Sequence, residues 1–432
     1  MSEHSFDVEK LSQDERDDVP LLPPSTTKEV PVGTTTPAAI FNLTNTVIGA
    51  GVLTLPYAMK VAGLGIGLLL LVIIALASFA AFHFLVAAGN EVGESSYKMI
   101  AKKLWGKGWD YVCEIFVALY TLGTCCSYTI ILSDYANLVI GAFDEHAAEQ
   151  WYGSRQFCLA IIAILILFPL SMLQRIDFLK YTSFASLVCV IFVIVVVLVY
   201  WLMAMAGSVE SSISTEPVVW AKGGIDVFLA APLLGVSYTA HYNVLNIYNE
   251  MSNRSHKKFS PVISSSVIIV SITYLLMSIP GYLTWRDDTP SNILDIYPNS
   301  FIPATLARLA LAITISFSYP LVQFALKLVI LRIVGFNNAS SAKRPYHIMI
   351  SIFVLIIAVT LAMFVDDISI VTSFSGSLFG TNIVFTIPAL FFFTIRKDTK
   401  SRVIAVIVAV VGVFFCVVGF WNAIRKAMGL SD

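Results

Sequence analysis

Long apolar segments recur along the whole chain, and they constrain the fold more than any other feature of the sequence. Most reach the roughly 20 residues that an α-helix needs to cross the hydrocarbon core of a membrane. A helix satisfies its own backbone hydrogen bonds, which lipid cannot do. We therefore predict an all-α polytopic membrane protein. Its eleven expected spans are 38–59, 62–88, 111–141, 156–173, 178–206, 226–249, 261–285, 301–334, 345–364, 368–395 and 401–422.

The composition agrees with a membrane protein and excludes several other classes. Apolar residues make up 57% of the chain and charged residues 13%, whereas a soluble domain carries about 25% charged residues. The formal net charge of −1 gives no reason to expect nucleic acid. The six cysteines lie in or beside apolar runs without a CxxC pair, so we expect packing residues and neither a disulfide nor a metal site. We find no catalytic motif and predict no enzyme and no cofactor.

Polar termini and basic residues predict the orientation of the chain. Residues 1–37 are polar, acidic and rich in Ser, Thr and Pro, and we expect a disordered cytosolic tail. With the N-terminus inside, the five inner connections carry 16 Lys and Arg and the five outer ones carry 4. Because basic residues favour the cytosolic side, this predicts a short non-cytosolic C-terminus at 423–432. Arg425 and Lys426 run against the rule.

The first span contains residues that weaken a helix. Residues 45–58 read NTVIGAGVLTLPYA. Each interior glycine costs about 1 kcal/mol relative to alanine, and Pro56 has no N–H to donate to the Val52 carbonyl. A broken span is tolerated where it is buried in protein or lines a polar cavity. The alternative explanation is that small residues allow close helix packing and that the proline only kinks the span.

The sixth span shows the same weakness. Residues 226–250 read DVFLAAPLLGVSYTAHYNVLNIYNE, with Pro, Gly and many polar side chains. An inverted repeat is expected to have two interrupted helices, each the first of five consecutive spans. The two repeats would be 38–206 and 226–395, and 401–422 would be an extra helix. In such folds free N–H groups bind a carboxylate and free carbonyls and hydroxyls hold a cation. We therefore predict a site for a small zwitterion and a coupling ion.

These segments resemble the amino acid/auxin permease family, and most closely its branch of sodium-coupled neutral amino-acid transporters and vacuolar amino-acid transporters. FNLTNTVIGAGVLTLPYAM (41–59) resembles the first helix of the family and SYTAHYNVLNIYNEM (237–251) its sixth. RLALAITISFSYPL (308–321) and DDISIVTSFSGSLFGTNIVFTIPALFF (366–392) resemble its eighth and tenth. The resemblance implies a LeuT-like fold of five plus five spans with one extra, and amino-acid transport driven by a cation gradient.

The resemblance also implies site residues. The amino and carboxylate groups of the substrate would meet the backbone of Thr46, Val47, Ile48, Gly49, Ala50 and Gly51. Candidates for the pocket wall are Tyr120, Thr124, Tyr128, Tyr238, Thr239 and His241. Asn45 matches the asparagine that the family associates with cation binding. Ser316 and Ser318 stand where the family often has threonines, so these three residues are the candidate ligands of a sodium ion.

His241 is the best candidate for a proton-coupled step. An ionisable group inside a span is functional by default, and histidine changes charge near neutral pH. The alternative is that its ring only supports the break with a hydrogen bond. No other acidic or basic residue lies clearly near the middle of a span, so we expect a neutral amino acid as substrate.

The N-terminal tail carries one candidate sorting motif. DDVPLL (17–22) fits an acidic dileucine pattern through Asp17, Leu21 and Leu22, which sorting adaptors read. We therefore favour a vacuolar, lysosomal or endosomal membrane and proton-linked export of amino acids from an acidic lumen to the cytosol. The alternatives are a sodium-coupled importer of the plasma membrane and an amino-acid sensor that transports slowly. A channel would show a polar stripe on several spans, whereas polarity here is concentrated at the two breaks.

Overall fold

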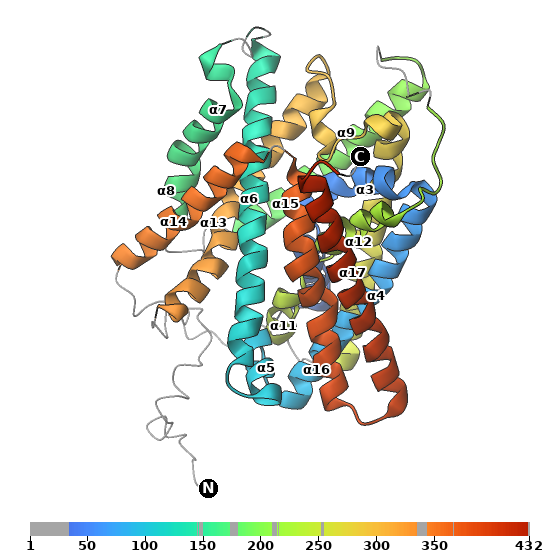
Figure 1. Cartoon of the computed structure of the whole chain (residues 1–432), viewed down its shortest axis with the longest axis vertical. Helices are drawn as coiled ribbons and strands as arrows, with labels where there is room; N and C mark the ends of the chain where they lie inside the picture. Colours follow the sequence, from blue (N-terminus) through green and yellow to red (C-terminus); the bar gives the residue numbers. More distant parts are fainter. Residues whose placement is uncertain are drawn as a thin grey trace.

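The computed structural model describes residues 34–144, 146, 150–172, 180–209, 214, 216–251, 255–334, 344–365 and 367–430. These residues form one bundle of helices (Figure 1). The sorting pattern at Asp17, Leu21 and Leu22 lies outside the described residues.

Helices occupy all eleven ranges that the sequence predicts. Some ranges hold a single long helix: α4 (Leu64–Val92), α6 (Trp109–Phe143), α9 (Lys180–Met205), α12 (His256–Trp285), α13 (Ile302–Ile333), α14 (Arg344–Phe364) and α17 (Thr399–Ala427). The others hold consecutive shorter helices: α2 (Thr36–Val47), η2 (Ala50–Thr54) and α3 (Leu55–Ala62); α7 (Arg155–Ile162), η5 (Ala163–Leu167) and α8 (Phe168–Ser171); η7 (Ile225–Leu229), α10 (Ala230–Ser237) and α11 (His241–Glu250); α15 (Ile368–Ser375), η11 (Gly376–Gly380), η12 (Asn382–Thr386) and α16 (Ile387–Ile395).

Within the described residues, eight helices are long and apolar enough to cross a membrane. The bent pair formed by α2 and α3 makes a ninth if it counts as one span. Residues 155–171 and the α10–α11 pair are shorter, so their crossing of the membrane stays a prediction. Large apolar side chains are exposed along the outside of these helices, for example Leu76 at 64% and Val410 at 60%. This exposure is what contact with lipid, instead of water, allows.

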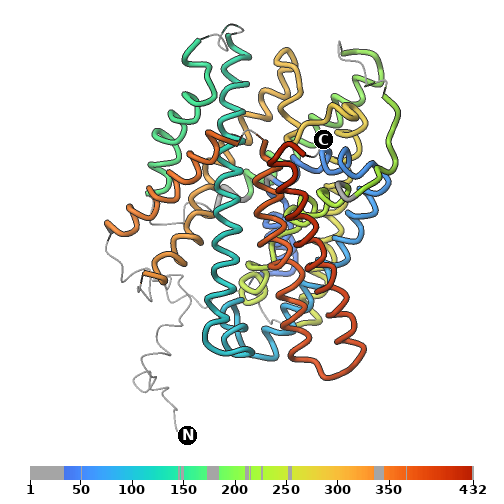
Figure 2. Tube along the Cα trace, viewed as in Figure 1, coloured from blue at the N-terminus to red at the C-terminus, as the bar shows by residue number. Residues whose placement is uncertain are grey.

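Equivalent spans of the two predicted repeats pack against one another. α3 of the first span packs on α10 of the sixth, α4 on α12, and α6 lies along α13. Figure 2 shows the traces of the first span (blue) and the sixth span (green) passing each other inside the bundle. α17 packs on α15 and α16, and its C-terminal end lies close to α3 (Figure 1). The two broken spans therefore lie in the middle of the molecule.

Some elements are not anticipated by the sequence analysis. A short helix, α5 (Tyr97–Trp105), lies in the connection after the second span, at the opposite end of the bundle from α3 (Figure 1). It buries Tyr97, Ile100 and Ala101 and is too short and too charged to resemble a span. The fourth and tenth spans contain π-helical turns at η5, η11 and η12. Such turns often accompany functional sites.

Candidate functional site

The first span is broken where its glycines predict a break. α2 ends at Val47, Ile48 and Gly49 have extended backbone, and η2 leads into α3. The two halves meet at an angle of 54°. Within the described residues we find no hydrogen-bond acceptor for the N–H groups of residues 49–51. The N-terminal side of the second half thus presents free donors, as an anion requires.

The predicted effect of Pro56 on the Val52 carbonyl is wrong. The Leu55 N–H donates to that carbonyl through the 3-10 turn. Pro56 itself lies in the first turn of α3, where a missing N–H deprives no helical partner. The break therefore follows from the extended residues before η2, and the proline favours the restart of the helix.

The sixth span is broken between Ser237 and His241. The N–H groups of Tyr238 and Thr239 donate to the carbonyls of Gly235 and Val236, at 3.2 and 3.0 Å, which tightens the end of α10. The helix restarts at His241, after Ala240 at the N-cap. In this part of the chain no backbone N–H donates to the Ser237 carbonyl. The Ser237 carbonyl instead accepts a hydrogen bond from the side-chain hydroxyl of Tyr274 on α12.

The two breaks touch at Gly51. A Cβ atom at this position would lie 2.9 Å from Ser237 Oγ and 3.2 Å from Ser237 Cα. The Ser237 hydroxyl lies within hydrogen-bond distance of two carbonyl oxygens, that of Gly51 at 3.1 Å and that of Leu233 at 3.0 Å. Gly51 is therefore required for the close approach of the two chains, and any side chain would force them apart.

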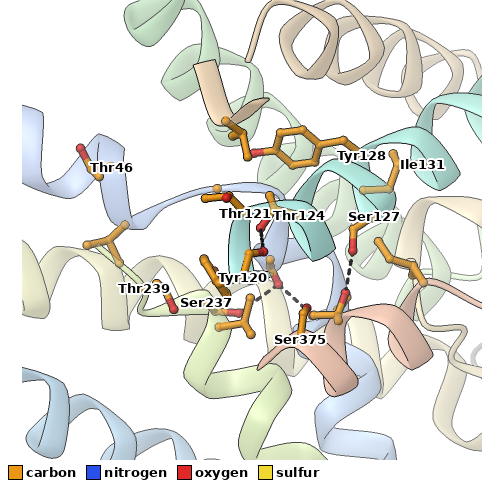
Figure 3. A pocket seen from close by; sticks show the side chains of 18 of the residues that line it. Thr46, Tyr120, Thr121, Thr124, Ser127, Tyr128, Ile131, Ser237, Thr239 and Ser375 are labelled. Carbon is orange, nitrogen blue, oxygen red and sulfur yellow. Dashed lines mark hydrogen bonds between the residues drawn. The ribbon is translucent and has the colours of Figure 1, made fainter. Parts of the chain in front are cut away.

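A cavity of about 110 Å³ opens beside the two breaks (Figure 3). The residues around it come from the first, third, sixth, eighth and tenth spans, and most carry a hydroxyl group. They are Thr46, Val47, Gly49, Gly51, Thr54, Tyr120, Thr121, Thr124, Ser127, Tyr128, Ile131, Val236, Ser237, Thr239, Tyr242, Val322, Ile368, Thr372 and Ser375. No Asp, Glu, Lys, Arg or His side chain is among them. The charges of a zwitterion would therefore have to be met by backbone groups and hydroxyls.

One face of α6 forms a wall of this cavity. Figure 3 shows Thr121, Thr124, Ser127 and Tyr128 along the helix, with Ser127 joined to Thr372 of α15 by a hydrogen bond of 3.3 Å. Thr124 and Tyr128 are among the residues predicted from the sequence, whereas Thr121 and Ser127 are not. Their spacing of three and four residues places them on one helix face, and this spacing is the pattern that could have revealed them.

The structure places the other candidates in different surroundings. Of the predicted substrate residues, Thr46, Val47, Gly49, Gly51, Tyr128 and Thr239 line the cavity, whereas Ile48, Tyr238 and His241 do not. Ile48 is buried at the extended step after α2, and Ala50 begins η2. The Tyr238 hydroxyl instead lies 2.7 Å from Ser271 Oγ of α12.

His241 is buried away from the cavity, against α4. Its ring stacks on Phe82 with centroids 3.9 Å apart, and its Nε2 lies 3.4 Å from the Ser78 carbonyl oxygen. Its Nδ1 is buried without a hydrogen-bond partner among the described residues. This environment fits support of the restarted helix.

None of the three candidate cation ligands, Asn45, Ser316 and Ser318, lines the cavity between the breaks. The Asn45 side-chain oxygen is buried and has no partner in the described part of the chain. The hydroxyls of Ser316 and Ser318 donate to the carbonyls of Ala312 and Thr314, at 2.7 and 2.9 Å. Each hydroxyl oxygen keeps a free lone pair. No described hydrogen bond and no shared cavity joins Asn45 to the two serines.

A second cluster joins three elements at the end of the bundle near α3. The Lys426 ammonium of α17 lies 2.7 Å from the Asp367 carboxylate and donates to the hydroxyls of Tyr57 and Ser369. Burial alone would raise the pKa of Asp367, but Lys426 and hydrogen bonds hold it below its usual value. Lys426 therefore ties α17 to α3, the second half of the first span, and to the start of α15.

The connection between α12 and α13 holds a partly buried carboxyl group, that of Asp295. Asn292 donates to Asp295 at 2.6 Å, and Tyr135 of α6 donates to Asn292 at 3.1 Å. Burial raises the pKa of Asp295 well above its usual value, and the nearby Asp134 acts in the same direction while Arg308 opposes it. Arg308 is itself occupied, because its guanidinium donates to backbone carbonyls of the same connection.

The opposite end of the bundle is held by a different network. Arg332 at the end of α13 lies 2.9 Å from Asp110 and 2.8 Å from Glu114 of α6. Lys98 of α5 lies 3.4 Å from the same Glu114. Since these side chains are mostly buried, the network fixes α13 and α5 to the first turns of α6.

Comparison with known proteins identifies this architecture. Residues 32–425 match the family described as transmembrane amino acid transporter protein. The chain belongs to this family. The family resemblance seen in the sequence is thereby confirmed, and the chain is a membrane transporter and no enzyme.

Curated relatives and one solved structure support the family and the fold. The chain is 26% identical to "Sodium-coupled neutral amino acid transporter 7" of Danio rerio over 94% of this chain and 90% of that protein. It is 28% identical to the protein of the same name from Homo sapiens, over 83% and 78%. The structure of MhsT in complex with L-phenylalanine superposes with a TM-score of 0.58 at 10% identity, covering 89% of this chain and 98% of that one. The LeuT-like helical fold is therefore confirmed.

Proposed function

We propose that the protein is a cation-coupled secondary transporter of neutral amino acids that works by alternating access. The observation that carries this proposal is the cavity between the two broken spans, which is lined by backbone and hydroxyl groups and by no ionised side chain. Relatives that the chain matches over most of its length are named sodium-coupled neutral amino acid transporters.

The chemistry of the cavity suits both ends of an amino acid. The free N–H groups at residues 49–51 lie at the start of a helical segment, where a carboxylate is stabilised. The carbonyls of Val47 and Ser237 end the preceding half-helices, where a cationic ammonium is stabilised. A side chain with a net charge would find no partner among the lining residues, so the substrate is neutral.

The size of the cavity favours a small substrate. An apolar cavity of roughly 150 Å³ holds a benzene molecule, and this one measures about 110 Å³. Ile131 and Val322 form apolar parts of its wall. We therefore propose a substrate such as alanine or serine for the conformation described here.

For the coupling ion we propose a proton, with sodium as the alternative. His241 would accept the proton only if its buried ring became accessible, because it does not line the cavity. The Asn45 side-chain oxygen, which has no partner among the described residues, is the candidate sodium ligand. Ser316 and Ser318 would complete a sodium site only if they moved toward Asn45. We further propose a vacuolar, lysosomal or endosomal membrane, a cytosolic N-terminus whose tail carries an adaptor-binding motif, and export from the lumen to the cytosol.

Alternating access requires contacts that open and close at the two ends. We propose that the Lys426–Asp367 cluster closes the luminal end and that the Arg332 network closes the cytosolic end. Each joins elements from both repeats or from α17, so each must break for its own side to open.

The proposal is tested by uptake of radiolabelled neutral amino acids into proteoliposomes. A pH gradient and a sodium gradient are imposed separately, for the wild type and for Gly51→Val. We expect uptake of alanine or serine under the pH gradient, and its loss in the variant while the protein stays monodisperse. Uptake that responds to the sodium gradient alone would show that sodium, and not the proton, is the coupling ion. Binding without movement under any gradient would refute transport and favour a sensor.

A further inference from the structure

Tyr274 of α12 connects the two breaks from behind the cavity wall. Its hydroxyl lies 3.1 Å from the Val47 carbonyl oxygen and also donates to the Ser237 carbonyl oxygen. Val47 is the last residue of α2 and Ser237 is the last residue of α10. The side chain of Tyr274 is fully buried. A single hydroxyl thus meets the two carbonyls that end the first halves of both broken spans.

The two carbonyls need such a donor. The C-terminal end of a helix carries a partial negative charge, and here two such ends meet in the interior of the bundle. Neither carbonyl receives a backbone N–H in the described part of the chain. A buried carbonyl without a donor is strongly destabilising, so the phenol stabilises both the ends and their mutual approach.

The phenol can satisfy only one of them at a time. A tyrosine hydroxyl carries a single hydrogen, whereas two acceptors lie within its reach. The carbonyl that does not receive this hydrogen remains available as an acceptor. Val47 and Ser237 both line the cavity, whereas Tyr274 does not. The carbonyl that is not bonded to the Tyr274 hydroxyl can therefore accept a hydrogen bond from a group that enters the cavity.

The surroundings hold Tyr274 in this position. The Tyr238 ring packs edge-on against the Tyr274 ring, with centroids 5.1 Å apart. The Tyr238 hydroxyl lies 2.7 Å from Ser271, one turn before Tyr274 on α12. Ser266 on the same helix donates to the Ile40 carbonyl of α2 at 3.2 Å. α12 is therefore hydrogen-bonded to both broken spans, and the phenol has little freedom to turn away.

We propose that Tyr274 is a positioning residue that sets the two carbonyl acceptors for the ammonium group of the substrate. The inference rests on the proposed function, in which the cavity binds an amino acid. The hydroxyl holds the Val47 and Ser237 carbonyls side by side, shares its one hydrogen between them, and leaves the second acceptor for the ammonium. It also links the break of the first span to that of the sixth, so the two respond together when the site fills.

Tyr274→Phe removes the hydroxyl and keeps the ring. Tyr282→Phe is the matched control, because Tyr282 is equally buried on the same helix. Among the described residues its hydroxyl is hydrogen-bonded only to the Val219 backbone, at 3.2 Å from the nitrogen. We expect Tyr274→Phe to raise the KM for alanine about tenfold or more while kcat changes less. Tyr282→Phe should leave the KM unchanged, whatever it does to stability.

Two measurements test the role of Tyr274 without a transport assay. The first is thermal stabilisation of the purified protein by alanine compared with propionate, which lacks the ammonium. The wild type and Tyr282→Phe should distinguish the two ligands and Tyr274→Phe should not. The second is hydrogen exchange, which should quicken at residues 47–52 and 237–241 in Tyr274→Phe alone. If no substrate is transported but these two results hold, the proposed transport fails and the role of Tyr274 stands.

An equal KM, an equal preference for alanine and equal exchange in wild type and Tyr274→Phe would overturn the inference. If Tyr274→Phe does not fold, 3,5-difluorotyrosine introduced at position 274 alters the hydroxyl in place. A change in the KM for alanine that the same substitution at position 282 does not cause would support the role. No change would overturn it.

Discussion

Gly51→Ala adds one methyl group at the point where the two broken spans touch. The new Cβ would lie 2.9 Å from Ser237 Oγ, 3.2 Å from its Cα and 3.5 Å from its Cβ. Rotation of the serine relieves the first of these contacts, but the contact with Cα requires the backbone to move. Overpacking of this kind costs about 1–3 kcal/mol, and about 1.4 kcal/mol corresponds to a tenfold change in an equilibrium constant. If the strain falls on the loaded state, affinity for glycine or alanine should fall by roughly 5-fold to 150-fold.

Gly49→Ala is the control for this prediction. No atom lies within 4 Å of a Cβ placed at Gly49, and its φ of −114° is open to any residue. Because its methyl group would enter the cavity, free glycine is the ligand to titrate, by thermal shift and by equilibrium binding. A double variant of Gly51→Ala with Ser237→Ala should recover part of the loss, since the closest atom is removed. Equal glycine binding in both single glycine variants, or no recovery in the double variant, would refute the close-approach argument.

Three further predictions follow from other parts of the molecule. Ile131→Ala widens the cavity, so discrimination against larger neutral side chains should fall about 10-fold to 200-fold in competition for alanine uptake; unchanged selectivity would mean that Ile131 does not limit side-chain size. Lys426→Met leaves Asp367 without its cation, and for a partly buried pair we expect about 1–3 kcal/mol of weakening. Thiol labelling of a cysteine placed at Thr54 should then quicken from the membrane side at which Lys426 lies. An unaltered rate would mean that Lys426 does not hold this end closed. Asp295 has a raised pKa, so its protonated form stabilises the α12–α13 connection at acidic pH, and this contribution is lost as the pH rises through that raised pKa. Asp295→Asn should therefore flatten the pH dependence of thermal stability above about pH 4. If the slope of stability against pH is unchanged, the pH dependence comes from another group.

Much of the fold follows from the sequence because a membrane allows few alternatives. Lipid satisfies no backbone group, so each apolar run of sufficient length forms a helix, and the ends of α9 and α13 lie within two residues of their expected positions. The break of the first span was accessible because its glycines lie at the break. In the sixth span Pro232 lies within α10, and the helix ends only at Ser237. α5 was missed because nine residues with three lysines resemble a loop.

The site was harder to predict for a geometric reason. Helical spacing does not continue through residues that are not helical, so Tyr238 and His241 could not be assigned a face from the sequence. Both side chains instead contact neighbouring helices, α12 and α4. The hydroxyl stripe of α6 does lie in a regular helix, and a search for polar residues at three-residue and four-residue spacing would have added Thr121 and Ser127.

Arg425 and Lys426 run against the orientation rule, and the structure explains Lys426. The rule counts residues in loops, but α17 continues to Ala427, past the expected end at 422. Lys426 therefore belongs to the end of a helix and pairs with Asp367 inside the bundle. Its charge serves a contact within the protein, which no count of basic residues in loops can show.

The central claim is that an amino acid binds between the two breaks, with its carboxylate on the N–H groups of residues 49–51 and its ammonium on the Val47 and Ser237 carbonyls. The most direct test is an experimental structure of the full-length protein in lipid nanodiscs at saturating L-alanine, beside one without it. We expect density for one alanine in the cavity, within hydrogen-bond distance of those groups. An empty cavity with alanine bound elsewhere, or alanine contacting neither break, would contradict the account.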